Sequence, residues 1–288
     1  MRTRPECLPC SLRQIVTIAD RVTRDDDLRM DLLRRGMRYL GEASPERTPA
    51  ELSTDLFHLV AEALGSPDPY GPEKERYNRE AMALYPVLRK TIADSADPLH
   101  TAVLVSVAGN LIDLGILAPV AVEEAVAGIL KKGLARNDLA ALREDLARAE
   151  SLLFVGDNAG EIAFDRLLVE EIRREYPAVA VTFAVKSGPC MNDATRADAE
   201  AVGMGEIAAV IETGGAHLGA PRAGLSPAFR EAFRRAGAVI AKGHANYETL
   251  DEQPRPALYF LLTVKCAVVA AALGVREGDS VLAGAAAR

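Results

Sequence analysis

Hydrophobic residues in the first half of the chain recur every three and four positions, the spacing of amphipathic helices. The segments with this pattern are Cys10–Asp20, Asp26–Leu40, Pro49–Leu64, Lys74–Ala93, Leu99–Leu117, Ala118–Leu134 and Asn137–Ala149. Leu99–Leu117 is apolar on most sides, which predicts a central helix. Its polar interruptions, Asn110 and Asp113, lie one turn apart and therefore on one face. The pattern predicts a helical domain over residues 1–149.

From Glu150 onward, short apolar runs alternate with amphipathic segments. The runs are Leu152–Val155, Val179–Val185, Ala208–Ile211, Ala238–Ile240 and Leu258–Val264, and the helical segments are Glu161–Glu175, Asp193–Val202, Pro227–Ala236 and Lys265–Leu273. Such alternation is typical of a parallel sheet with helices on both faces. We therefore predict an α/β protein whose second domain, residues 150–288, is a three-layer α/β/α Rossmann-like domain with a mainly parallel sheet. The Ala-rich end, Leu282–Arg288, is expected to fray.

Polar side chains follow the apolar runs. Asp157 and Asn158 follow the first, Lys186 the second, Lys242 the fourth and Lys265 the fifth. Because parallel strands end at one edge of a sheet, where ligands bind, these groups should converge. Carboxylate and amide oxygens suit Mg²⁺ or Mn²⁺, and lysines bind phosphate oxygens as point charges. This edge is therefore predicted to hold a divalent cation beside a phosphorylated ligand.

A second amide–acid pair, Asn192 and Asp193, stands before a helix after the second run. Aspartate is also a leading N-cap residue, so Asp157 or Asp193 could instead cap the helix that follows it. Two such pairs on neighbouring loops favour a shared cation, because one carboxylate rarely holds an ion alone. Beyond the fourth run, Asn246 and Glu248 could orient the substrate.

Composition narrows the class of partner. The chain has 288 residues, of which 49% are hydrophobic and 26% charged, enough for a large buried core. A formal net charge of −7 argues against nucleic acid, whose binding depends on a basic surface. No apolar span is long enough for a bilayer and no signal-peptide core follows the N-terminus, so no membrane is expected and the predicted location is cytoplasmic. The oligomeric state is left open.

The cysteine pair Cys7 and Cys10 allows more than one interpretation. A Cys-x-x-Cys can be half of a zinc site or a redox pair. Cys190 and Cys266 are possible partners, but neither belongs to a second Cys-x-x-Cys. We therefore favour the interpretation that Cys7 and Cys10 are two half-buried residues at the start of a helix, rather than part of a structural metal site. The histidines show no metal-ligand spacing.

Several short motifs together resemble the DUF89 family of metal-dependent damage-control phosphatases. They are Gly156-Asp-Asn-Ala-Gly-Glu161, Asn192-Asp-Ala-Thr195, Lys242-Gly-x-x-Asn-Tyr-Glu248 and Leu261-Leu-x-x-Lys-Cys266. Two more resemble the family's prokaryotic branch with an N-terminal Cys-x-x-Cys, namely Cys7-Leu-Pro-Cys10 and Gly109-Asn-x-Ile-Asp113. The chain departs from the family pattern at Glu212-Thr-Gly-Gly-Ala-His217, which bears on the substrate, and at Ala267.

The resemblance implies a helical N-terminal domain packed on the α/β/α domain, with the active site between them. It implies one divalent metal ion (Mg, Mn, Co or Ni) held by Asp157, Asn158 and Asp193, with Asp157 and Lys242 as catalytic residues. The expected substrate-binding residues are Lys186, Asn192, Asn110, Lys242, Asn246 and Glu161. The partner would be a small phosphorylated metabolite.

The predicted activity is metal-dependent hydrolysis of phosphomonoesters such as sugar phosphates or related damaged metabolites. A cation would polarise a phosphoryl oxygen while Lys242 offsets charge on the transferred group. Attack by water and attack by Asp157 both stay open, although haloacid-dehalogenase-type phosphatases carry a second aspartate where this chain has Ala159. Two alternatives are an S-adenosylmethionine-dependent methyltransferase, suggested by the spacing of Gly156 and Gly160, and a non-catalytic phosphometabolite-binding protein.

Overall fold

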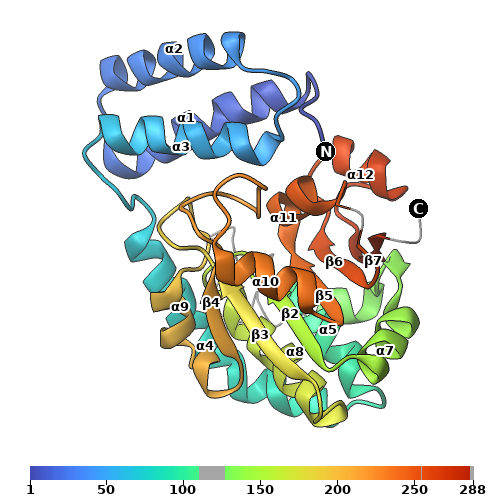
Figure 1. Ribbon diagram of the computed structural model, residues 1–288. Coiled ribbons are helices and arrows are strands. Elements are labelled where there is room, and N and C mark those ends of the chain that lie inside the picture. The colour runs from blue at the N-terminus through green and yellow to red at the C-terminus, as the bar shows by residue number, and fades with distance from the viewer. Residues whose placement is uncertain (110–126, 254, 286–288) are drawn as a thin grey trace.

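A seven-stranded sheet runs through the larger part of the protein in the computed structural model, which describes residues 1–109, 127–253 and 255–285 (Figure 1). Its strands are β1 (Arg136–Asn137), β2 (Ser151–Val155), β3 (Ala180–Val185), β4 (Ala209–Glu212), β5 (Ala238–Lys242), β6 (Leu258–Thr263) and β7 (Ser280–Gly284). Their order across the sheet is β1-β7-β6-β5-β2-β3-β4, and every neighbouring pair is parallel except β6 and β7. The predicted α/β fold with a mainly parallel sheet is confirmed.

Helices cover both faces of the sheet (Figure 1). One face packs against α4 (Gly71–Ala93), α5 (Pro98–Ala108), α7 (Leu139–Arg148) and α8 (Glu161–Glu175), and the other against α10 (Pro227–Arg235), α11 (Gly243–Leu250) and α12 (Ala267–Leu273). The short helix α9 (Arg196–Ala201) and the 3₁₀ turn η2 (Met204–Glu206) lie beside β4. The three predicted layers are therefore present.

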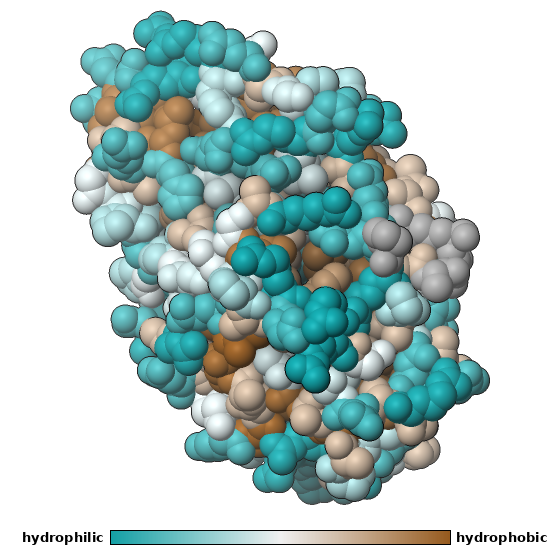
Figure 2. All heavy atoms as spheres, in the orientation of Figure 1, coloured by the Kyte–Doolittle hydropathy of each residue, from teal (hydrophilic) through white to brown (hydrophobic). Residues whose placement is uncertain are grey.

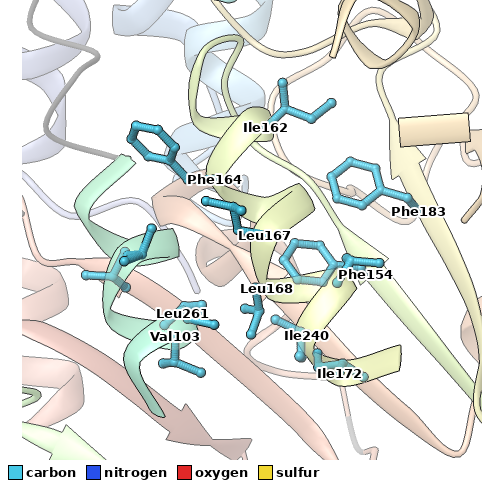
Figure 3. Close-up of a cluster of buried hydrophobic side chains, with 14 of the residues drawn as sticks. Val103, Phe154, Ile162, Phe164, Leu167, Leu168, Ile172, Phe183, Ile240 and Leu261 are labelled. Carbon is cyan, nitrogen blue, oxygen red and sulfur yellow. The ribbon is translucent and has the colours of Figure 1, made fainter. Parts of the chain in front are cut away.

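Alternating side chains of the central strands explain why these runs are apolar throughout. Phe154 and Ile240 belong to the core beneath α5 and α8, whereas Leu153 and Val239 belong to the core beneath α11 and α12. Figure 3 shows Phe154 and Ile240 among the side chains of α8. Because successive residues of a strand point to opposite faces, a strand buried on both sides has no position for a polar residue. Polar chemistry is thereby confined to the strand ends.

A bundle of α1 (Cys7–Val22), α2 (Asp26–Glu42) and α3 (Pro49–Ala63) lies at one end of the molecule (Figure 1). It has a buried core of its own, which also takes in Cys190 and Leu218 from loops that follow β3 and β4. The backbone N–H of Leu218 donates to Thr54 Oγ1 on α3 at 3.0 Å, and His58 Nε2 lies 2.6 Å from the carbonyl of Ala216. The bundle is therefore fastened to loops at the carboxyl edge of the sheet. The division into 1–149 and 150–288 stays a prediction.

Several segments differ from the sequence prediction. The expectation that Leu282–Arg288 frays is wrong for residues 282–284, which belong to β7 and pair antiparallel with β6. The segment after Lys242, which is not among the predicted helices, is helix α11. The predicted helix Asp193–Val202 begins later, at Arg196. Of the predicted helix Ala118–Leu134 the structure describes residues 127–134, of which 127–132 are helical, and residues 110–117 at the end of Leu99–Leu117 lie outside the described residues.

Hydrophilic residues predominate on the face drawn in Figure 2, and hydrophobic residues show between them in smaller patches. Large hydrophobic side chains that stand exposed are few among the described residues and are scattered: Val22, Met30, Met37 and Val87. In the described part of the chain, no helix combines the length and the apolar character that crossing a bilayer requires.

Candidate active site

The direction of the chain through the sheet reverses between β2 and β5. From β2 it proceeds outward to β3 and β4, and from β5 it proceeds outward to β6 and β7 on the other side. Such a switch point leaves a crevice outside the carboxyl ends of the two strands, where open α/β sheets bind ligands. Asp157 follows β2 after one glycine, and Lys242 is the last residue of β5. Both therefore lie at this crevice.

The loop after β2 is closed by its own side chains. Asn158 Nδ2 donates to Asp157 Oδ2 at 3.0 Å and to Glu161 Oε2 at 3.2 Å. Because both amide protons are used, the side chain of Asn158 has its carbonyl oxygen to offer a ligand. Helix α8 begins with Gly160 at its N-cap and no side-chain cap. The alternative in which Asp157 caps this helix is therefore wrong.

The loop after β3 is joined directly to the loop after β2. Asn158 and Asp193 form an isolated antiparallel bridge. The N–H of Ala194 donates to the carbonyl of Asp157 at 2.8 Å, and the N–H of Ala159 donates to the carbonyl of Asn192 at 2.9 Å. The two amide–acid pairs therefore lie side by side. The N-cap of α9 is Thr195, so Asp193 does not cap that helix.

Lys186 and Lys242 are both buried, and their ammonium groups have protein partners. Lys186 Nζ donates to the carbonyl of Gly219 at 2.5 Å and lies 3.5 Å from Asp193 Oδ2. Lys242 Nζ donates to Glu161 Oε1, to Asp165 Oδ1 and, at 3.1 Å, to the carbonyl of Ser106. These three acceptors match the three protons of an ammonium. The predicted contact of Lys242 with substrate phosphate stays a prediction, and in this structure Lys242 holds Glu161.

Helix α11 brings the backbone of the fourth loop against the first. Asn246 Nδ2 donates to the carbonyl of Gly156 at 3.0 Å and to that of Lys242 at 2.7 Å. Its Oδ1 is buried and has no hydrogen-bond partner within the described residues. A buried amide oxygen without a donor is costly unless a ligand occupies it. Asn246 therefore has an acceptor to offer next to the Asp157 loop.

Gly243 approaches the carboxylate of Asp157 more closely than any other residue type could. It has φ +76°, and a Cβ added there would lie 1.8 Å from Asp157 Oδ2. We expect Gly243→Ala to displace this carboxylate and to lower activity about 100-fold, the cost of a misplacement near 1 Å. Phosphate release per folded enzyme measures the effect.

The matched control for that substitution is Gly41→Ala in α2, where an added Cβ meets no atom within 4 Å. It is expected to leave the rate unchanged. Wild-type activity in folded Gly243→Ala would contradict the close approach as a functional requirement.

Buried charge at this edge is out of balance. The carboxyls of Asp157, Glu161, Asp165 and Asp193 face the ammonium groups of Lys186 and Lys242, all of them buried. Two negative charges are left over if every group ionises. Burial raises the pKa of Asp157 well above its usual range, and the carboxyls of Asp193 and Glu161 raise it further. A divalent cation would supply the missing positive charge, so the donor set fits such an ion.

The carboxylates at this edge would not be sufficient by themselves to hold a cation. Within the described ranges, no three His, Cys, Asp or Glu side chains form a ready metal-ligand cluster. An ion bound here would therefore depend on amide oxygens as well as on Asp157 and Asp193. Hard oxygen ligands of this kind suit Mg²⁺ and Mn²⁺.

Three residues at this edge are not among the site residues that the sequence predicts, although Lys265 is among the polar residues that follow an apolar run. Asp165 contacts Lys242, and burial raises the pKa of Asp165 to about 7. Ser106 Oγ donates to Asp165 Oδ1 at 2.6 Å. Lys265 is exposed and acts to lower the pKa of Asp157 through its charge. The position of Asp165 one turn after Glu161 on a largely apolar helix was the available signal. Asn110, predicted to bind substrate, lies outside the described residues.

His244 fixes the backbone of that exposed lysine. The backbone N–H of Lys265 donates to His244 Nε2 at 2.7 Å. Burial, with the nearby charge of Lys265, lowers the pKa of His244 to about 4, so the ring is neutral near pH 7. A neutral ring can accept this hydrogen bond, whereas an imidazolium cannot.

The cysteines fall into two places. Cys190 is buried in the core of the α1–α3 bundle. Cys7 and Cys10 lie at the start of α1, half-buried and exposed respectively. Burial raises the pKa of both thiols, and the proximity of Cys266 and Glu248 raises each further. The structure thus brings Cys266 near the pair, but a thiol with a raised pKa is a poor nucleophile.

The fold and the polar residues at the strand ends together define a class: an α/β protein with a ligand site at the carboxyl edge of its sheet. The sequence matches the family described as Damage-control phosphatase ARMT1-like domain over residues 3–281. A damage-control phosphatase of Archaeoglobus fulgidus is 36% identical over 287 residues, which are 98% of each chain. One of Pyrococcus horikoshii is 34% identical over 280 residues, 96% of each chain.

A crystal structure is similar as well. It is that of a DUF89 family protein from Pyrococcus horikoshii, which is 33% identical, superimposes with a TM-score of 0.92, and shares 99% of each chain. The chain belongs to the damage-control phosphatase ARMT1-like (DUF89) family. It is an enzyme that hydrolyses phosphate esters, as the resemblance of its motifs predicted. The comparisons favour this activity over the methyltransferase and the non-catalytic alternative.

Proposed function

We propose that the crevice between β2 and β5 is the active site and that it hydrolyses phosphomonoesters of small metabolites, sugar phosphates or related damaged metabolites, with one divalent cation. The observation that carries the proposal is the direct joining of the Asp157–Asn158 and Asn192–Asp193 pairs in a buried region with two unbalanced negative charges. Mg²⁺, Mn²⁺, Co²⁺ and Ni²⁺ are the candidate ions.

Asp157, Asn158 and Asp193 are the residues that would hold the ion. When bound, it supplies Lewis-acid polarisation of a phosphoryl oxygen and a water of lowered pKa. The protein's own part is to fix these oxygens: the two loops bond to each other through Ala159 and Ala194, and Gly243 keeps the space beside Asp157 free of a Cβ. Preorganised charge of this kind needs no rearrangement at the moment of reaction.

Lys186, Lys242 and Lys265 have different roles in this proposal. Of the three lysines that follow apolar runs, Lys265 is exposed and its charge acts on Asp157, which suits contact with the substrate phosphate. In this proposal Lys186 and Asn192, from the loop after β3, and Asn246, from α11, are the further substrate-binding residues. Lys242 positions Glu161, which in turn accepts from Asn158. Through that chain of contacts Lys242 orients the amide of a proposed ligand.

Removal of metal tests the proposal. The purified protein is dialysed against a chelator, and phosphate release from p-nitrophenyl phosphate and from a panel of sugar phosphates is measured before and after adding Mg²⁺, Mn²⁺, Co²⁺ or Ni²⁺. Activity is expected to fall to background on chelation and to return with at least one ion, because the ion would supply the Lewis acid and the water of lowered pKa. Activity that survives chelation unchanged would remove the metal from the proposal.

A further inference from the structure

One buried carboxamide on α4 contacts the loop that carries Asp157 and Asn158 and also the helix that follows the Asp193 loop. Asn78 Oδ1 accepts from the backbone N–H of Gly160 at 2.7 Å, and Asn78 Nδ2 donates to Asp198 Oδ1 at 2.7 Å. Gly160 ends the loop of Asp157 and Asn158, whereas Asp198 lies in the first turn of the helix that follows Asp193. Asn78 is only 5% exposed, so these two bonds form away from water.

Asp198 passes the constraint on to the second loop. Its Oδ2 accepts from the backbone N–H of Thr195 at 2.8 Å and from Thr195 Oγ1 at 2.7 Å, which completes the capping box of α9. Thr195 in turn forms a bridge with Lys186. The position of Asp198 therefore fixes where the chain leaves the Asp193 loop.

The two contacts together need a side chain that accepts one hydrogen bond and donates another, as a carboxamide does. A carboxylate at position 78 could accept from Gly160 but would repel Asp198, and an apolar side chain could do neither. Lys74, one turn earlier on α4, adds the balancing charge: its Nζ lies 3.5 Å from Asp198 and 3.3 Å from Asp68. Asp198 therefore has a buried cation beside it that comes from α4 and not from the crevice.

The backbone at Gly160 shows how closely α4 packs against the loop. Gly160 has φ +78°, and a Cβ there would lie 2.9 Å from Tyr77 Cβ. Helix α4 therefore lies directly against the turn that presents Asp157 and Asn158. The contacts of α4 with Gly160 and Asp198 therefore act on the two loops in addition to the bonds that the loops make with each other.

We propose that Asn78, although distant in sequence from every predicted ligand, is a positioning residue that sets the spacing between Asp157–Asn158 and Asp193 and thereby the affinity for the cation. This inference rests on the proposed function, because it assumes that these residues hold an ion. Groups that orient metal ligands typically contribute 10- to 100-fold in affinity, roughly the effect expected here.

The test exchanges the side chains of Asn78 and Asp198 with each other. Mn²⁺ binding to the metal-free full chain is titrated by electron paramagnetic resonance of the free ion, for wild type, Asn78→Asp, Asp198→Asn and the double variant that combines them. Each single substitution breaks the donor–acceptor match and is expected to raise the Kd for Mn²⁺ at least about tenfold. The double variant restores one amide facing one carboxylate with the same charge, and its Kd should return to within about threefold of wild type.

A control on the same helix separates positioning from general loosening. Tyr85 OH donates to Glu170 Oε1 at 2.5 Å, a second α4–α8 contact remote from the crevice. Tyr85→Phe is expected to bind Mn²⁺ like wild type. A wild-type Kd in Asn78→Asp, a double variant as weak as the single ones, or an equal loss in Tyr85→Phe would each overturn the inference.

Amide hydrogen exchange tests the role of Asn78 without depending on metal binding, so failure of this inference can be told from failure of the proposed function. In Asn78→Ala, the amide of Gly160 loses its acceptor and should exchange at least about tenfold faster than in wild type. If wild type binds no Mn²⁺, the proposed metal site is wrong, and exchange then decides alone. Faster exchange at Gly160 supports Asn78 as the residue that holds the loop, and unchanged exchange overturns it.

Discussion

Asp157→Asn is expected to lower phosphate release by about three orders of magnitude at saturating Mn²⁺. The substitution keeps the shape of the side chain but removes a charge that would face the ion, and metal-ion catalysis is worth several kcal/mol at 1.36 kcal/mol per tenfold in rate. The measurement is the steady-state rate with p-nitrophenyl phosphate, corrected for folded protein.

Folding should not suffer from this change. Asp157 is buried beside two other carboxyls that raise its pKa, so a neutral amide relieves repulsion in the metal-free protein. The matched control is Asp145→Asn, at the opposite edge of the sheet, where Asp145 accepts from Tyr259 OH at 2.5 Å. It should keep wild-type activity. An Asp157→Asn enzyme that retains a tenth of the rate or more would show that this carboxylate is not part of the machinery.

Lys242→Met should destabilise the fold by about 3–5 kcal/mol at pH 8, the usual cost of removing one partner from a buried ion pair. Lys242 is fully buried and is bonded to Glu161 and Asp165. Without the ammonium, two buried carboxylates would face each other unbalanced. Urea denaturation followed by circular dichroism measures the change in the free energy of unfolding. Activity should fall as well, because Glu161 loses the contact that orients it toward Asn158.

The loss should depend on pH in a defined direction. Burial already raises the pKa of Asp165 to about 7, although Lys242 acts to lower it. An acid whose pKa is raised by folding takes up protons more readily when folded, so the penalty is full above its folded pKa and fades as pH falls toward its unfolded value near 4. The difference between wild type and Lys242→Met should therefore be smaller at pH 5 than at pH 8.

The surface control for this variant is Lys90→Met, which removes an exposed lysine paired with Asp94 on α4. It should change stability by less than about 0.5 kcal/mol at either pH. A Lys242→Met protein as stable as wild type at pH 8 would contradict the buried pairing.

Sequence periodicity was sufficient to predict the sheet and the edge at which the site lies. The runs that became β2, β3, β5 and β6 are apolar on both faces, so a polar residue such as Asp157 directly after a run had to mark its end. The adjacency of the Asp157 and Asp193 loops followed from the same reasoning. Strand β7 was missed because its alanines and its position near the end of the chain resemble a frayed tail, and only pairing with β6 makes it a strand.

The roles of the individual lysines could not be read in the same way. Lys186, Lys242 and Lys265 all follow apolar runs, and nothing local distinguishes a lysine buried against carboxylates from one facing the crevice. Lys242 bonds to Ser106 and Asp165, and these two residues belong to helices that precede β5 by many residues. Asn78 carries no local signal at all, because its bonds to Gly160 and Asp198 span 82 and 120 positions of sequence. Such contacts exist only once α4 has packed.

The burial of the site has a consequence for turnover. The side chains of the predicted site residues that the structure describes are between 0% and 8% exposed. The loop that bonds to Lys186 at Gly219 is also fastened to the α1–α3 bundle at Thr54 and His58. We therefore expect that the surrounding protein surfaces part when a metabolite reaches these residues and when inorganic phosphate leaves them. We expect this opening motion, rather than cleavage of the ester, to be rate-limiting for the best substrates. Solvent viscosity should then slow kcat.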